Sequence, residues 1–281
     1  MIFINSEHET EKYLNFGGSM EKRSILERFI SWRVKHISDQ QFMLMLSVFV
    51  GLAVGIGAVI IKNSVHFIKH LLTSGFAEQY QNYLYFAYPT IGILGAVLFI
   101  RYVIKQHVGH GIPSVLYAKS KTNGMIKPSN MYSSIITSAL TVGFGGSVGL
   151  EGPTVATGAA IGSNVGRVLR LNYKQITSLL GFACAGAMAA IFKAPIAAIV
   201  FALEVIMLDL TMSALVPLLT ASVTAALTSY FVFGMQVLYT FELKDEFLLR
   251  DVPYYIIFGI LAGLLSVYFT RMYMSIAGVF D

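Results

Sequence analysis

The sequence is poor in charge and in cysteine, and both shortages limit what the protein can be. Only 12% of its 281 residues are Asp, Glu, Lys or Arg, while 56% are hydrophobic. Soluble globular chains carry about 25% charged residues, so the composition indicates an integral membrane protein. The single cysteine, Cys184, lies in an apolar stretch. An internal disulfide is therefore excluded, and we expect Cys184 to be a packing residue.

The sequence also lacks the motifs of nucleotide, metal and hydrolytic chemistry. It contains no Walker A loop, no His-Glu-x-x-His motif and no Gly-x-Ser-x-Gly motif. We therefore expect no enzyme activity, no cofactor, no metal and no ATP-driven transport. His66 and His70 share one short segment without an obvious third ligand. The net charge of +5 is explained by basic cytoplasmic loops, so nucleic-acid binding is not expected.

Apolar segments of two lengths follow one another along the chain. Two long runs, Phe42–Ile61 and Tyr83–Ile104, have the length that crosses a bilayer, and a polar link joins them. After Met131 the segments become shorter and are interrupted by glycine and proline, as expected for helices that end inside a membrane. The sequence therefore predicts an all-α integral membrane protein with broken and re-entrant transmembrane helices. The later segments are Met131–Phe144, Pro153–Leu169, Gln175–Phe192, Pro195–Met207, Ser213–Phe233 and Pro253–Val279.

Residues 1–40 differ from the rest, since they are polar and carry six Lys/Arg and six Asp/Glu. Within them, Ser24–Ile37 suggests an amphipathic helix on the membrane surface, with Ile25, Phe29, Trp32 and Ile37 along one side. A soluble cap on the first span is the alternative. The loop Arg101–Lys127 has five Lys/Arg and no acid. We therefore predict a cytoplasmic arm over residues 1–40 and a multi-pass domain of the cell membrane over residues 41–281.

Glycines at regular steps predict close helix packing. Gly51, Gly55 and Gly57 lie in the first span. Gly158, Gly162 and Gly166 follow Pro153 at steps of about one helical turn. Small residues let two helices approach closely in a membrane, so these positions are expected to contact other helices rather than a ligand.

Two glycine–proline signatures, Gly109–Pro113 and Gly149–Pro153, interrupt this apolar sequence. Proline suits the first turn of a helix, and glycine lets the backbone approach a neighbour closely. A helix start carries unpaired N–H groups and a partial positive charge, so it attracts anions. Two such starts inside a membrane would form an anion site built largely from main chain, and we expect the two turns to face each other.

Three titratable residues near these signatures have open roles. Glu151 lies just ahead of the second helix start, where its carboxylate would compete with an anion; a plain contact with the helix dipole is the alternative. His110 could donate a hydrogen bond to an anion, titrate in a vestibule, or simply face water in a turn. Glu204 could belong to a proton route, but a structural role as a cap or partner is favoured.

These signatures, together with Gly143–Pro153 and Phe192–Glu204 in this order and spacing, resemble the CLC family of chloride channels and chloride/proton antiporters. The resemblance covers most of residues 40–281. It implies a homodimer with one anion pathway per subunit, each subunit being two inverted repeats. It also implies that Glu151 is the gate and that the anion is held near His110, Gly111, Ile112, Gly149, Leu150 and Gly152.

Three departures from the family pattern modify this expectation. His110 stands where the family usually has serine, so selectivity for chloride is less certain than for anions in general. Val205 stands where proton-coupled members often carry glutamate, which favours a passive channel. The second repeat is missing, so residues 41–281 are expected to be the first repeat plus one helix. An inactive or half-pore fragment and an exchanger for another small anion are the alternatives.

Overall fold

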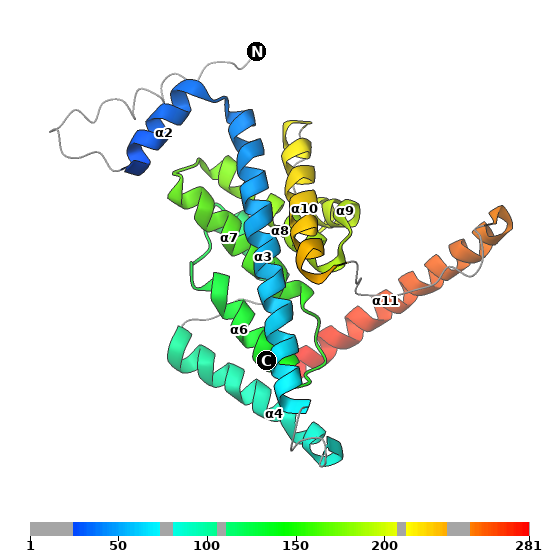
Figure 1. Cartoon of the computed structure of the whole chain (residues 1–281). Helices are drawn as coiled ribbons and strands as arrows, with labels where there is room; N and C mark the ends of the chain where they lie inside the picture. Colours follow the sequence, from blue (N-terminus) through cyan, green and yellow to red (C-terminus); the bar gives the residue numbers. More distant parts are fainter. Residues whose placement is uncertain (1–24, 74–80, 106–110, 207–211, 235–247, 281) are drawn as a thin grey trace. The chain divides into compact units, whose positions relative to one another are not determined.

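All secondary structure in the described residues of the computed structural model is helical, which confirms the predicted fold class (Figure 1). The described ranges are 25–73, 81–105, 111–206, 212–234 and 248–280. The chain forms two compact units, Met1–Leu238 and Tyr239–Asp281. The elements are α2 (Ile25–His36), α3 (Asp39–Thr73), α4 (Gln81–Leu98), η2 (Phe99–Ile104), α5 (Gly111–Lys121), α6 (Asn130–Gly143), α7 (Glu151–Val168), α8 (Tyr173–Phe192), α9 (Pro195–Glu204), α10 (Met212–Phe233), η3 (Leu249–Asp251) and α11 (Val252–Phe280).

Spanning and non-spanning helices occur together, as predicted. Five segments of the described residues are long and apolar enough to cross a membrane. In contrast, α5 and α9 have only 11 and 10 residues. A helix of that length extends about 15 Å, half of a hydrocarbon core of ~30 Å. The five segments are Asp39–Thr73, Ala87–Ile104, Tyr173–Phe192, Ala214–Phe233 and Leu249–Val279.

The first long helix extends beyond its predicted end. The prediction placed a polar link after Ile61, but α3 continues to Thr73. The tail of α3 packs on other elements: a Cβ added to Gly143 would lie 2.7 Å from Ile68 Cγ2, and the Tyr88 hydroxyl donates to the Leu72 carbonyl at 3.4 Å. The link was misread because it is polar, whereas polar residues do not end a helix in the absence of glycine or proline.

Helices α3, α8 and α10 pack against one another and form the centre of the first unit. A Cβ added to Gly51 of α3 would lie 2.7 Å from the Ala221 carbonyl oxygen of α10, and one added to Gly186 of α8 would lie 3.4 Å from the same atom. Gly51 lies about as far along α3 from its start at Asp39 as Gly186 lies along α8 from its start at Tyr173. Farther along, Ala58 of α3 and Ala190 of α8 share a buried cluster, so the two helices run in the same direction and their starts lie at about the same level.

The glycine ridge of α7 packs on α8, as predicted. A Cβ added to Gly158 or Gly162 would lie 2.8 Å from the carbonyl oxygen of Ala183 or Leu179, respectively. Both added atoms would be too close to rigid backbone, so only glycine fits at this crossing. Gly55 of α3 is equally close to α10, since its added Cβ would lie 2.7 Å from Thr228 Cβ.

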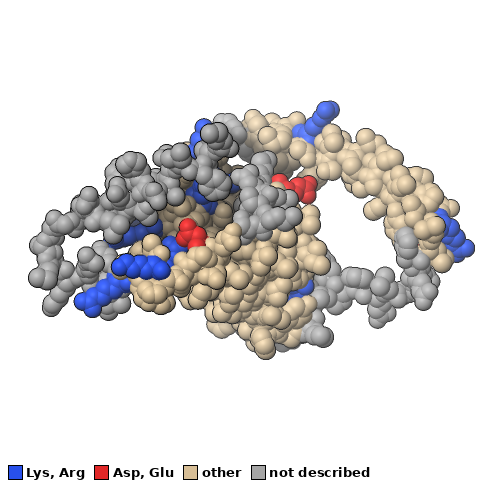
Figure 2. Space-filling model, turned by 90° about the horizontal axis from the view of Figure 1, so that it is seen from above, with Lys and Arg blue, Asp and Glu red and all other residues tan. Residues whose placement is uncertain are grey.

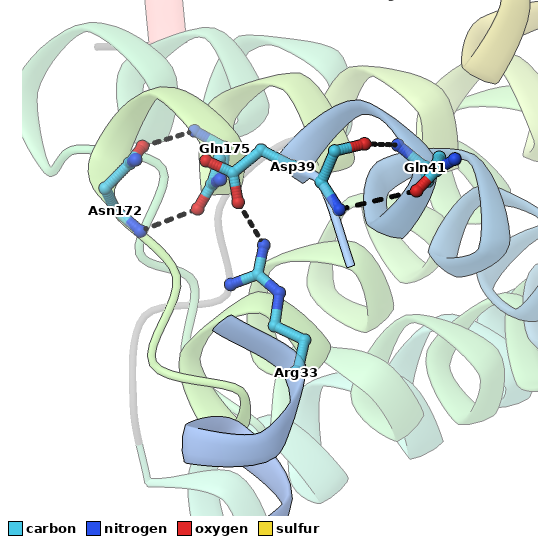
Figure 3. Close-up of polar contacts among 6 residues, drawn as sticks. Arg33, Asp39, Gln41, Asn172 and Gln175 are labelled. Atoms are coloured by element: carbon cyan, nitrogen blue, oxygen red, sulfur yellow. Dashed lines mark hydrogen bonds and ion pairs between the residues drawn. The ribbon is translucent and has the colours of Figure 1, made fainter. Parts of the chain in front are cut away.

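The neighbouring starts of α3 and α8 carry the same polar cap (Figure 3). At α8, the Gln175 amide donates to the Asn172 side chain at 2.9 Å, and the Asn172 amide donates to the Gln175 side chain at 3.2 Å. At α3, Ser38 and Gln41 make the same reciprocal pair, at 3.4 Å in both directions. Each cap satisfies main-chain donors that a helix start would otherwise leave unpaired.

The amphipathic helix before α3 is present as α2, but its residues are arranged differently from the prediction. Ile37, grouped with Trp32 on the apolar side, packs partly against the core. Trp32 is 50% exposed, whereas Arg33 is only 8% exposed. The Arg33 guanidinium lies 4.0 Å above the Phe42 ring and donates to the Asp39 carboxylate at 2.5 Å. This ion pair turns α2 so that Arg33 faces α3.

Candidate functional site

The two glycine–proline turns, which are separated in the sequence by α5 and α6, meet in the structure. A Cβ added to Gly111 would lie 3.3 Å from Gly152 Cα, and one added to Gly152 would lie 3.9 Å from Gly111 Cα. Gly111 also has φ of +38°, a backbone conformation that side chains disfavour. The starts of α5 and α7 are therefore in main-chain contact. The predicted anion ligand His110 lies outside the described residues.

The start of α7 leaves several main-chain donors without acceptors. The Thr154 amide donates to the Leu150 carbonyl at 3.0 Å, and the Thr154 hydroxyl donates to the same oxygen at 2.7 Å. Pro153 has no N–H. Among the described residues, none accepts a hydrogen bond from the amides of residues 149–152. These N–H groups and the positive end of the α7 dipole favour a negative charge at this position.

Glycines shape the turn that leads from α6 to these donors. Gly145 has φ of +92° and donates its amide to the Val142 carbonyl at 3.0 Å. The Gly146 amide donates to the Thr141 carbonyl at 2.9 Å, and a Cβ on Gly146 would lie 2.6 Å from that oxygen. The chain can reverse this tightly only without side chains at these positions, and the reversal directs the start of α7 toward α5.

Glu151 lies at the helix start with its carboxylate folded back along the chain. It is the first residue of α7 rather than the residue ahead of the helix, which corrects the predicted boundary. Its carboxylate contacts the position that a Cβ on Gly149 would occupy, with Cδ 2.8 Å from that point. The side chain is half-buried, and within the described residues the carboxylate has no hydrogen bond or ion pair. Its negative charge thus lies beside the turn that carries the free amides.

Ile112 anchors the start of α5 in the core. It packs against a buried apolar cluster that includes Val115 of α5, Val155 of α7 and Cys184 of α8. Cys184 is free and buried, which confirms its predicted packing role. The Ser114 hydroxyl donates to the Gly111 carbonyl at 2.7 Å. The apolar contacts of Ile112 therefore hold the turn at Gly111 against α7.

Two buried polar residues that sequence reasoning missed hold the far end of α5. The Ser163 hydroxyl of α7 donates to the Gly124 carbonyl at 2.6 Å and accepts from the Ile126 amide at 2.9 Å. Asn164 donates to the Ile126 carbonyl at 3.3 Å. These bonds fix the α5–α6 loop to α7. The signal in the sequence was weak: two adjacent polar residues in an otherwise apolar, glycine-rich helix.

Glu204 lies apart from this arrangement. It is the last residue of α9 and is exposed, and no hydrogen bond or ion pair links it to another described residue. Just beyond it, the Lys119 ammonium of α5 donates to the Ile206 carbonyl at 3.1 Å. Within the described ranges, no three His, Cys, Asp or Glu side chains gather closely enough to hold a metal ion.

Comparison with known sequences identifies relatives named as chloride channels and as chloride/proton exchange transporters. The profile of the family described as "Voltage gated chloride channel" matches residues 91–281. A "Putative chloride channel protein ClcB-like" of Ralstonia nicotianae is 30% identical over 180 residues, which are 63% of this chain and 42% of the relative. The "H(+)/Cl(-) exchange transporter ClcA" of Vibrio campbellii is 27% identical over 244 residues, or 82% of this chain and 51% of the relative. The chain thus spans about half or less of these relatives.

Solved structures agree on the fold. A slow cyanobacterial Cl-/H+ antiporter superposes with a TM-score of 0.68 at 20% identity, over 82% of this chain and 56% of the other. A CLC-type fluoride/proton antiporter superposes with a TM-score of 0.60 at 29% identity, over 75% of this chain and 51% of the other. At its low identity, the first likeness concerns the fold alone.

The family profile and the structure agree on the same part of the chain. The matched residues 91–281 contain both glycine–proline turns, the whole of α7 and all the later helices. They make up more than half of the sequence. The helical membrane fold, the structural neighbours and this match lead to one conclusion: the chain belongs to the voltage gated chloride channel family.

Proposed function

We propose that this protein carries chloride or a similar small anion across a membrane through a site at the starts of α5 and α7. The observation that most supports this proposal is the main-chain contact between Gly111 and Gly152. It lies beside the amides of residues 149–152, which have no acceptor among the described residues. Amides and helix dipoles stabilise an anion without a fixed positive charge that would hold it too tightly. Gly111, Ile112, Gly149, Leu150 and Gly152 would supply these donors.

Glu151 would act as the gate. Its carboxylate already lies against Gly149, where it offers a tethered negative charge to the same donors that an anion would use. The ionised side chain and a transported anion repel each other, so they exclude one another from this position. Protonation removes that repulsion and lets the side chain leave. Flux should therefore rise as pH falls.

Chloride efflux from liposomes that contain the purified chain tests the gate. Wild-type flux should increase at low pH, whereas Glu151→Gln, which imitates the protonated side chain, should give high flux at every pH. Glu204→Gln removes an exposed carboxylate outside this arrangement and should leave the pH dependence of flux unchanged. A Glu151→Gln variant with the pH dependence of the wild type would contradict the proposal.

Val205 follows Glu204 where proton-coupled members often carry glutamate, and we propose passive, channel-type movement on this basis. The exchanger alternative is supported by the relatives, because one is called a chloride/proton exchange transporter and one structural neighbour a fluoride/proton antiporter. A chloride gradient that drives protons uphill would establish the exchanger. Competition between chloride and fluoride in the same assay would show whether His110 sets the selectivity.

A second candidate function is an assembly module that contributes half of a pathway. It is supported by the exposed main chain at Gly149, beside the donors at the start of α7. The module predicts no flux from the purified chain and flux only after reconstitution with a partner. Flux from the purified chain would exclude it.

We also propose a homodimer in the cell membrane with the N-terminus in the cytoplasm.

A further inference from the structure

The position of α2 along the membrane normal is set by the short connection to α3. α2 ends at His36, and α3 begins at Asp39. The buried apolar residues of α3 start at Phe42, which is about 4.5 Å of helix after Asp39. A helix joined this closely to a span must lie at the boundary between the hydrocarbon core and the polar headgroups, whatever the function of the chain.

The contacts of Arg33 determine which side of α2 faces outward. Arg33 is turned toward α3 through Asp39 and the Phe42 ring, and this pair lies beside the capped start of α8 (Figure 3). Outside this contact, α2 exposes Arg28, Trp32 and Lys35, and the Trp32 ring stacks on His36 with 5.3 Å between the ring centroids. A half-exposed tryptophan near two cations suits the headgroup region, where its ring buries apolar area.

The same end of the first unit collects further positive charge. The starts of α3 and α8 lie at one level, so the α7–α8 corner joins α2 at this end, and the bonds of Ser163 bring the α5–α6 loop there. Lys and Arg side chains are spread over this end in Figure 2. The basic surface consists of the exposed residues Arg28, Lys35, Lys121, Lys127, Arg167, Arg170 and Lys174. Among the described residues of these segments, the acids are Glu27 and Asp39.

We propose that α2 and this basic surface bind anionic phospholipid headgroups of the bilayer that holds the protein. A membrane surface with anionic lipids attracts Lys and Arg side chains, and this attraction falls with added salt. Trp32 would enter the interface while Arg28 and Lys35 contact phosphate-bearing headgroups on either side. This inference does not depend on the anion pathway, because it rests on the outward side of α2 and the charge around it.

The experiment uses Trp32 as the probe, since it is the only tryptophan of the chain. The full chain is reconstituted in phosphatidylcholine bilayers with increasing phosphatidylglycerol, and its emission is recorded with either lipid brominated. We expect the emission of Trp32 to shift to the blue as phosphatidylglycerol is added. Brominated phosphatidylglycerol should quench this emission about twofold more strongly than the same mole fraction of brominated phosphatidylcholine. High salt should reduce this preference.

Charge variants make the test specific. Arg28→Gln with Lys35→Gln should abolish the preference for phosphatidylglycerol, whereas Lys69→Gln, an exposed charge near the other end of α3, should preserve it. Equal quenching by the two brominated lipids would overturn the proposal, and so would an unchanged preference in the double variant. Because fluorescence does not require transport, failure here leaves the proposed anion pathway untouched, and loss of flux leaves this result untouched.

Discussion

Gly111 is the residue at which backbone conformation and contact coincide. Its φ of +38° disfavours a side chain, and an added Cβ would lie 3.3 Å from Gly152 Cα. We expect Gly111→Ala to push the starts of α5 and α7 apart and to lower chloride flux about tenfold, a loss of about 1.4 kcal/mol in transition-state stabilisation. Chloride efflux from liposomes with equal amounts of folded protein measures this.

The matched control for Gly111 is Gly95. A Cβ on Gly95 would meet Leu140 Cδ1 at 3.9 Å, an ordinary contact. Gly95→Ala should therefore keep both flux and thermal stability. Equal flux in the Gly111 and Gly95 variants would show that the contact between the two turns is unimportant for transport.

Ser163 carries a prediction about stability. Its hydroxyl pairs with both the Gly124 carbonyl and the Ile126 amide in a buried position. Ser163→Ala leaves both groups unpaired, so we expect a loss of about 1–3 kcal/mol in the free energy of unfolding. Thermal unfolding in detergent measures the change. Ser120→Ala removes an exposed hydroxyl that bonds only within its own helix and should have almost no effect; equal losses would contradict the role given to Ser163.

Residues differ in how well the sequence reveals them. The glycine–proline turns and Glu151 were visible because helix starts have a local signature and because a carboxylate is costly in an apolar segment. Ser163 was not visible, since a hydroxyl in a helix can bond its own backbone, face a neighbour or face water. Its partners, Ile126 and Gly124, are distant in the sequence, and only the fold brings them together.

Among the elements, the α3–α10 crossing depends on two small residues of α3, Gly51 and Gly55. A Cβ on Gly55 would lie 2.7 Å from Thr228 Cβ, whereas one on Gly57 would lie 3.5 Å from its nearest neighbour. We expect Gly55→Ala to cost about 1–3 kcal/mol through overpacking and Gly57→Ala to be tolerated. Thermal unfolding of the two variants side by side checks this. Equal unfolding temperatures would contradict the prediction, because they would mean that α3 and α10 accommodate the added methyl group without loss of stability.

Helix boundaries show what the sequence pattern captures. The starts at Pro195 and near Pro153 were predicted closely, because proline marks a first turn. The end of α3 was placed too early, at Ile61 instead of Thr73. Hydropathy indicates where the chain enters and leaves the hydrocarbon core, while a helix continues until its hydrogen bonds are interrupted. The end of an apolar run therefore coincides with the end of a helix only where a residue such as glycine or proline stops the helix.

For the whole molecule, the proposed homodimer gives a prediction of mass. The exposed apolar residues Ile196 and Val200 of α9 and Leu219, Val223 and Leu227 of α10 offer a surface that a second copy or lipid can cover. We expect light scattering in detergent, corrected for bound detergent, to give twice the chain mass of 30.8 kDa. A mass of one chain at all protein concentrations would exclude the homodimer.

The fold class and the family could be predicted from composition and from three short signatures, since these depend on the membrane and on local turns. The main-chain contact of Gly111 with Gly152 was an expectation that only the coordinates could establish. Its residues come from helices separated by the α5–α6 loop and by α6, which the buried bonds of Ser163 and Asn164 hold in place.

The most direct test of the account is to locate a bound anion. Crystals of the protein grown in bromide give an anomalous signal wherever the ion binds. We expect a peak at the amides of residues 149–152, beside Gly111. The peak should be stronger in Glu151→Gln than in the wild type, because the competing charge is gone. Diffraction of both proteins in bromide with no peak between the starts of α5 and α7 would contradict it.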